Sequence, residues 1–224
     1  MGSPSFSARS GEQSPVERFR GIVASYDEGA ADYSALGGAT ARDWFAEPQR
    51  RFKAALPGGS QVLDLGCGPG LEMPDLRGLG LRPAGLDPSR QMLQFAGQRN
   101  PGSPLVQGTV LALPFADGAL DGAWAAASLH HVTRDEAPAA LAEIARIVRP
   151  GGAFYASVQR GEVEGWVRGQ LTGRDTWYTY HTESGWRALI EAAGFTLRWS
   201  LATDDVASAN EGATGWINTL AIRV

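Results

Sequence analysis

Apolar and polar residues follow one another along this chain in short blocks whose period changes between helix-like and strand-like. Residues 15–26 and 40–56 carry apolar side chains at helical spacing. From residue 61 onward, short runs rich in Val, Leu and Ala alternate with helical patterns. Such alternation predicts a parallel sheet covered by helices. We expect strands at 61–65, 83–87, 105–107, 120–127 and 153–158, and helices between them that include 89–99 and 134–148.

The C-terminal part has a different pattern. Thr182 is a suitable N-cap for a helix that runs to Ala193, and Gly194 is typical of the position where a helix ends. The next two apolar runs, 195–202 and 216–224, have no helical pattern between them. We therefore predict an antiparallel hairpin at one edge of the sheet.

Length and composition limit the kind of molecule. A chain of 224 residues with 43% hydrophobic and 20% charged residues is typical of one soluble globular domain. We expect residues 1–14, rich in Ser and Gly, to be disordered, residues 15–57 to form a helical cap, and residues 58–224 to form the core of the same domain.

Charge and cysteine content exclude several classes of partner. The net charge of −4 gives no general attraction to nucleic acid, and no apolar run reaches the roughly 20 residues of a membrane span. The single cysteine, Cys67, cannot form an internal disulfide, which indicates a cytoplasmic protein. Three histidines and one cysteine show no zinc-type spacing, so we expect no metal site.

A glycine-rich turn follows the first strand, in the sequence Val-Leu-Asp-Leu-Gly-Cys-Gly-Pro-Gly at residues 62–70. Glycine allows a ligand to approach the backbone closely, so the turn predicts a cofactor site. A dinucleotide fingerprint would need a small residue where Leu71 stands. The carboxylate of Asp64 would repel a pyrophosphate but suits an ammonium group. A tight turn without any ligand is the alternative.

Asp87 ends the second strand of the predicted sheet. Ligands of such sheets bind beyond the carboxyl ends of the strands, where an acid can hold the two hydroxyls of a ribose. A role as cap of the helix that begins near Ser89 is the alternative, and the two roles can coexist. Met92 either covers a purine face or fills the core. The backbone at 108–110 would border the base of a nucleoside held at Asp87.

The three histidines are candidates for proton transfer near neutral pH. His130 and His131 follow a strand of small side chains that ends at Ser128, and at most one of the two is expected to face a pocket. His181 ends the aromatic stretch 177–181, which either lines a substrate pocket or only buries aromatic area. A structural role is the alternative for each histidine.

The ordered set of motifs resembles the class I S-adenosylmethionine-dependent methyltransferases, from about Tyr26 to the C-terminus. The matching segments are 62–70, 85–89, 113–122, 128–132 and 141–152. The resemblance implies a Rossmann-like three-layer α/β sandwich. Its seven-stranded, mostly parallel sheet has the order 3-2-1-4-5-7-6 and an antiparallel last strand. It also implies S-adenosylmethionine as cofactor and methyl transfer as the reaction.

The same resemblance implies the roles of individual residues. The turn would hold the methionine part of the cofactor, with Asp64 near its ammonium group, and Asp87 would bind the ribose. Thr109 stands where related sequences often carry an acid that binds adenine, and a hydroxyl is a weaker acceptor. The expected cofactor-binding residues are Asp64, Gly66, Cys67, Gly68, Asp87, Pro88, Met92, Thr109, Val110 and Ser128.

Tyr26 and Tyr33 are similar to pocket-covering residues of small-molecule methyltransferases, where aromatic rings attract a sulfonium. Together with His181 they form the expected substrate pocket, and His130 or His131 is the expected base. We expect a small-molecule acceptor and no nucleic-acid or membrane partner. The alternatives are a protein that binds S-adenosylmethionine without transferring its methyl group, and an NAD(P)-dependent oxidoreductase.

Overall fold

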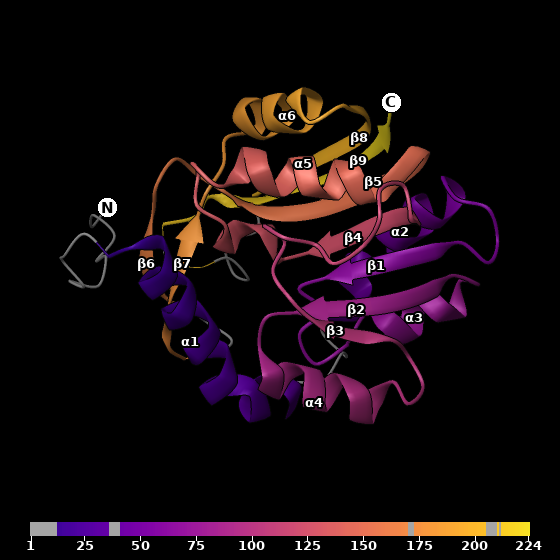
Figure 1. Ribbon diagram of the computed structural model, residues 1–224. Coiled ribbons are helices and arrows are strands. Elements are labelled where there is room, and N and C mark those ends of the chain that lie inside the picture. The colour runs from indigo at the N-terminus through magenta and orange to yellow at the C-terminus, as the bar shows by residue number, and fades with distance from the viewer. Residues whose placement is uncertain (1–12, 36–40, 170–172, 205–209, 211) are drawn as a thin grey trace.

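The computed structural model describes residues 13–35, 41–169, 173–204, 210 and 212–224. A seven-stranded sheet with the strand order β3-β2-β1-β4-β5-β9-β8 runs through the centre of the molecule (Figure 1). The strands of this sheet are β1 (Gln61–Leu65), β2 (Arg82–Asp87), β3 (Leu105–Gln107), β4 (Leu120–Ala126), β5 (Val148–Arg160), β8 (Phe195–Thr203) and β9 (Gly215–Arg223).

The first five strands of this sheet are parallel, whereas β9 pairs antiparallel with both β5 and β8. The last strand therefore lies between β5 and β8, which confirms the predicted order 3-2-1-4-5-7-6. The helices are α1 (Pro15–Ala35), α2 (Ala41–Ala54), α3 (Met73–Gly78), α4 (Arg90–Arg99), α5 (Ala137–Ile147) and α6 (Glu183–Ala192), with a 3-10 turn, η1, at Leu129–His131.

Two apolar clusters on opposite faces of the sheet make the core. On one face, Leu141 and Ile144 of α5 and Trp186 of α6 pack against the strands. On the other face, Phe52 of α2 and Leu76 of α3 do the same. Burial of side chains of this size stabilises the fold by about 1.5–3 kcal/mol each. The three-layer α/β sandwich predicted from the sequence is confirmed.

The elements differ from the prediction mainly in length. The helix expected at 15–26 continues to Ala35, and β5 begins at Val148, five residues earlier than expected. The start of α1 is fixed by Ser14: its N–H donates to the Glu17 carboxylate at 2.9 Å, and its hydroxyl accepts from the Glu17 N–H at 3.3 Å. Most of the segment expected to be disordered, residues 1–12, lies outside the described residues.

A separate two-stranded hairpin was not assigned from the sequence. It pairs β6 (Glu164–Arg168) with β7 (Asp175–Thr179), and Trp166 lies opposite Trp177. Aromatic residues favour strands because they pack well on a pleated surface. The aromatic stretch at 177–181 is therefore partly a strand, and it supports the wall of the site described below.

Helix α1 lies across the edge of the sheet at which β1, β2 and β4 end (Figure 1). Polar contacts attach α1 to the rest of the domain at two positions along its length. Asp27 accepts from the Ser89 hydroxyl at 2.6 Å and from the Gln91 N–H at 3.1 Å, and Arg18 pairs with Glu136 at 3.2 Å. These contacts hold the helix over the carboxyl ends of the strands. Within the described ranges, the helices include none that is long and apolar enough to cross a membrane.

Candidate active site

A cavity of about 800 Å³ lies between α1 and the carboxyl edge of the sheet. Its size is within the roughly 300–1,000 Å³ usual for small-molecule sites. Residues from the turn after β1, the ends of β2 and β4, the loop after β3, and helices α1 and α2 line it. The predicted site residues in this lining are Tyr26, Tyr33, Gly66, Cys67, Gly68, Asp87, Pro88, Met92, Thr109, Val110, Ser128 and His131.

The backbone conformation of the turn after β1 depends on its three glycines. Gly66, Gly68 and Gly70 have φ angles of 69°, 52° and 72°, in the left-handed region that glycine adopts without strain. A Cβ atom on Gly66 would lie 2.5 Å from the Cβ of Ser128, so the turn reaches close to the end of β4. Cys67 is buried in this turn, and Gly66, Cys67 and Gly68 all line the cavity.

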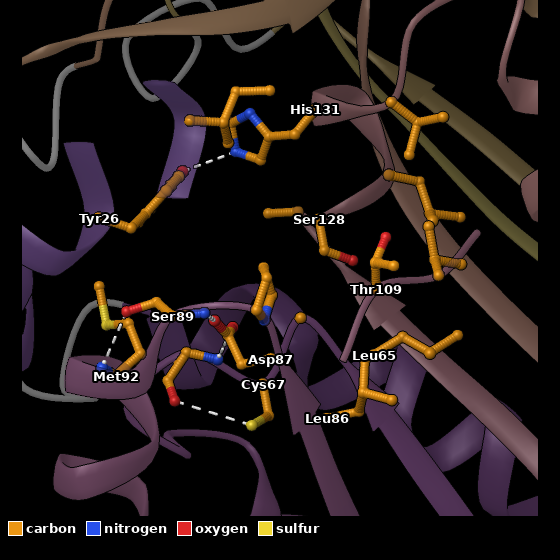
Figure 2. A pocket seen from close by; sticks show the side chains of 18 of the residues that line it. Tyr26, Leu65, Cys67, Leu86, Asp87, Ser89, Met92, Thr109, Ser128 and His131 are labelled. Carbon is orange, nitrogen blue, oxygen red and sulfur yellow. Dashed lines mark hydrogen bonds between the residues drawn. The ribbon is translucent and has the colours of Figure 1, made fainter. Parts of the chain in front are cut away.

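Asp87 anchors the turn and faces the cavity. One oxygen accepts from the Gly68 N–H and the other from the Ser89 N–H, both at 2.8 Å (Figure 2). Each carboxylate oxygen can accept a further hydrogen bond. Burial raises the pKa of Asp87 to about 6. The N-cap of α4 is Ser89, whose hydroxyl accepts from the Met92 N–H at 3.0 Å, so Asp87 does not have the capping role considered as its alternative.

Two carboxylates lie at the turn without an ion pair among the described residues. Asp64 is 2% exposed, and its Oδ2 has no hydrogen-bond partner in the described part of the chain. Asp64 itself lies just beneath the cavity lining, whereas Glu72, at the start of α3, lines it. Burial and the Glu72 charge raise the pKa of Asp64, and burial raises the pKa of Glu72 to about 7. This pair fits a cationic ammonium group, which would lower both pKa values.

The opposite wall carries a hydrogen-bonded pair, Tyr26 and His131 (Figure 2). The Nδ1–H of His131 donates to the Trp177 carbonyl at 2.7 Å, because that carbonyl is only an acceptor. Nε2 is then the acceptor for the Tyr26 hydroxyl, at 2.6 Å. Burial lowers the pKa of His131 to about 4, so the ring is neutral at neutral pH. Tyr33 meets the Tyr26 ring edge-on, at 6.3 Å between centroids.

The other two histidines lie outside the cavity lining. His130 is 3% exposed, and its ring packs against His131, Tyr178 and Trp216. His181 packs on Trp186 with 4.9 Å between the ring centroids. Its expected place in a substrate pocket is therefore wrong for this cavity, because the chain at His181 lies beside Arg160 of β5 and turns its ring into the core.

The remaining predicted residues complete the wall near β4. Thr109 uses its hydroxyl to accept from the Leu111 N–H at 3.3 Å. Ser128 lines the cavity, and its buried hydroxyl has no hydrogen-bond partner among the described residues. Ala127, just before it, has a φ of 50°, a strained conformation of the kind that concentrates at functional sites.

Sequence reasoning missed Glu72 and most of the apolar lining from α1 and α2. Glu72 stands directly after Leu71 at the start of a helix, and an acid one turn past a glycine-rich loop was the available signal. The apolar residues gave no separate signal, because their spacing is that of any helix packed on a core. The additional lining residues include Val16, Arg18, Phe19, Trp44, Phe45, Glu72, Leu111 and Glu136.

Comparison with known proteins shows that the chain is similar to methyltransferases. The model of a family described as a methyltransferase domain matches residues 63–156. An uncharacterized methyltransferase of Synechocystis sp. is 30% identical over 151 residues, which cover 64% of this chain and 70% of that protein. A malonyl-[acyl-carrier protein] O-methyltransferase of Pectobacterium atrosepticum is 33% identical over 151 residues, but the match covers only 59% of its length.

A solved structure has a similar fold over nearly the whole chain. It is the 1,6-didemethyltoxoflavin-N1-methyltransferase of Burkholderia thailandensis, with bound 1,6-didemethyltoxoflavin and S-adenosylhomocysteine. The TM-score is 0.76 at 20% sequence identity, and the alignment covers 99% of this chain and 94% of that one.

The fold and the carboxylate-rich cavity thus define a nucleoside-cofactor enzyme of the Rossmann-like type. The chain belongs to the class I S-adenosylmethionine-dependent methyltransferases, with S-adenosylmethionine as its cofactor. Membership of this family, together with the bulky Leu71 in the turn, excludes the NAD(P)-dependent oxidoreductase that was an alternative from the sequence.

Proposed function

We propose that this methyltransferase acts on a small-molecule acceptor in the cytoplasm. The observation that carries the proposal is one continuous cavity of about 800 Å³. An acidic end at Glu72 and Asp87 and a neutral end at Tyr26 and His131 share this space, and α1 forms one of its walls. Such a cavity admits a cofactor and a small acceptor together, and the helix over its edge leaves little access for a folded macromolecule.

The acidic end is the proposed cofactor half. Glu72 binds the ammonium group of the methionine part, and Asp64 supports it with its charge from beneath the lining. The backbone of the turn at Gly66 and Gly68 lies against the same part of the cofactor. Asp87 takes the ribose hydroxyls with its remaining lone pairs. Met92, Thr109 and Val110 border the adenine, Pro88 supports the turn beside Asp87, and Ser128 lies near the sulfonium with its unpartnered hydroxyl.

The neutral end is the proposed acceptor half. S-adenosylmethionine supplies a methyl group that is already activated by its positively charged sulfur, so the protein has mainly to position the acceptor and exclude water. A neutral hydroxyl becomes strongly acidic as its oxygen gains a methyl group. Its proton passes to the Tyr26 oxygen while the Tyr26 proton passes to Nε2 of His131. The imidazolium so formed keeps its Nδ1–H bond to the Trp177 carbonyl.

Methyl transfer and binding are tested together. Calorimetric titration with S-adenosylhomocysteine and NADH should show binding of the first alone, and incubation with labelled S-adenosylmethionine and a panel of hydroxyl- and amine-bearing small molecules should give methylated product. Tight S-adenosylhomocysteine binding without turnover of any acceptor would favour the alternative of a cofactor-binding protein without transferase activity.

The proton path makes a sharper prediction. Tyr26→Phe should lower kcat about 100-fold, the lower end of the usual range for acid–base catalysis, and should leave the affinity for S-adenosylhomocysteine unchanged. Tyr155→Phe is the matched control, because it removes a buried hydroxyl that bonds Asn218 at 2.7 Å outside the cavity. If Tyr26→Phe keeps full kcat, the enzyme works by positioning alone and no side chain takes the proton.

A further inference from the structure

The mouth of the cavity is unusually apolar. Val16 and Phe19 of α1, Trp44 of α2 and Leu111 of the loop after β3 are 58%, 39%, 45% and 36% exposed, and all four line the cavity. They are four of the seven large hydrophobic side chains that are exposed among the described residues. Exposed apolar side chains that gather at one opening mark a surface that a ligand covers.

The charged side chains at this end are already paired. Arg18 lies 3.2 Å from Glu136, and its guanidinium also stacks on the Trp177 ring at 5.2 Å from the centroid. Glu136 in turn accepts from the Thr133 hydroxyl at 2.7 Å. The other charged residues of the lining, Glu72 and Asp87, belong to the cofactor half. The acceptor half therefore offers no uncompensated charge among the described residues.

The polar groups that remain there are neutral. The Tyr26 hydroxyl donates to His131 and also lies within hydrogen-bonding reach of the Tyr178 hydroxyl. A hydroxyl oxygen has two lone pairs, so one is left for a donor on the acceptor. An acceptor with a carboxylate or an ammonium group would lose its hydration in this part of the cavity without gaining a charged partner, which is costly. A neutral molecule with a single O–H or N–H group meets no such cost.

We propose that the methyl acceptor is a neutral, predominantly apolar molecule that carries one O–H or N–H group. Its apolar body lies between α1 and Trp44, and its proton-bearing group faces Tyr26. The proposal names the substrate class of the site and rests on the proposed function. In the reaction a bond from the acceptor to the methyl carbon would form as the carbon–sulfur bond of S-adenosylmethionine breaks, and S-adenosylhomocysteine would be the leaving group. The acceptor's bond to hydrogen breaks as well, and the proton leaves through Tyr26 to His131.

A series of 4-alkylphenols from butyl to octyl tests this class directly. Binding to the protein saturated with S-adenosylhomocysteine is measured by calorimetry, so that no turnover is needed. The affinity should rise about fourfold per added methylene group, the value for transfer of a methylene group from water to an apolar site. The matched 4-hydroxyphenylalkanoates, which end in a carboxylate, should bind at least tenfold more weakly than alkylphenols of equal length.

Variants at two exposed apolar positions locate the binding. Val16→Asp at the mouth should weaken octylphenol binding at least tenfold, whereas Leu201→Asp, at a side chain of β8 that is 48% exposed and outside the cavity lining, should leave it unchanged. Both variants should still bind S-adenosylhomocysteine.

The outcomes separate the two proposals. Equal binding of phenols and carboxylates, no gain with chain length, no binding of any alkylphenol, or no effect of Val16→Asp would each overturn the apolar-acceptor proposal and leave the methyltransferase assignment intact. Failure of the wild-type protein to bind S-adenosylhomocysteine would instead overturn the proposed cofactor half, and the acceptor proposal with it.

Discussion

At the scale of single residues, Asp64 and Glu72 show how the free protein is prepared for a cation. Asp64 is buried and Glu72 is half-buried at the cavity wall, neither has an ion pair among the described residues, and burial raises the pKa of each. A carboxylate that loses hydration without a cation in contact with it is costly to keep ionised. A bound ammonium group supplies the compensation.

This arrangement predicts that cofactor binding depends on pH. Glu72, with a pKa of about 7, is largely protonated at pH near 5.5 and ionised near pH 8, and Asp87, with a pKa of about 6, changes in the same direction. The ammonium group binds the ionised form of Glu72, and the ribose hydroxyls donate to the ionised form of Asp87, so affinity for S-adenosylhomocysteine should rise roughly tenfold across this range. Calorimetric titration with S-adenosylhomocysteine at both pH values measures this change in affinity. Glu72→Gln should weaken the dependence, and equal affinities in the wild-type protein would contradict the assignment.

The sequence revealed one member of this pair and not the other. Asp64 stands inside the strand before the turn, where an acid has no role in the core, so its position alone indicated a ligand. Glu72 stands where any acid could stand at the start of a helix, and only the fold shows that it lies near Asp64 and lines the cavity. Likewise, the sequence placed His130 and His131 at the correct edge, but the direction of each ring depends on η1 and on the packing of β7.

At the scale of elements, the turn after β1 combines conformational strain with close packing. Gly66→Ala should cost about 1–2 kcal/mol for the left-handed backbone and further stability because its methyl group would overlap Ser128. It should also weaken S-adenosylhomocysteine binding at least tenfold, since the turn must shift. Gly59→Ala is the control, with a φ of 78° and no atom within 4 Å of the added carbon. Urea denaturation and calorimetry measure both effects.

If the two alanine variants lose equal stability and both keep full affinity, the close approach of the turn to β4 has no functional consequence. Strand β1, which leads into this turn, has the bounds expected from the sequence, and so has β3 at the edge of the sheet. A buried parallel strand such as β1 is a short apolar run bounded by turns, and local sequence is enough to find it. The β6–β7 hairpin was not predicted, since its strands are held by pairing of Trp166 with Trp177 across a segment that has no period of its own.

At the scale of the whole molecule, the site is complete only when α1 lies on the sheet edge. The predicted strand order placed Asp87 and the turn side by side. The resemblance of Tyr26 and Tyr33 to pocket-covering residues indicated that the first helix covers the pocket, but the sequence did not show which contacts would hold it there. The polar contacts of Arg18 and Asp27 with the core fix that position. Long-range contacts of this kind depend on the assembled fold and leave no local signature in the chain.

This role of α1 predicts a directional change in hydrogen exchange. A ligand held between α1 and the strand ends loses contacts whenever α1 opens, so S-adenosylhomocysteine at about 100 times its Kd should slow exchange in Pro15–Ala35 by up to about 100-fold. Helix α6, Glu183–Ala192, covers a face of the sheet away from the cavity and exchanges through other openings. It should show little change when both are followed by mass spectrometry. Equal slowing of α1 and α6 would mean that the ligand stabilises the fold as a unit and that α1 does not open separately over the site.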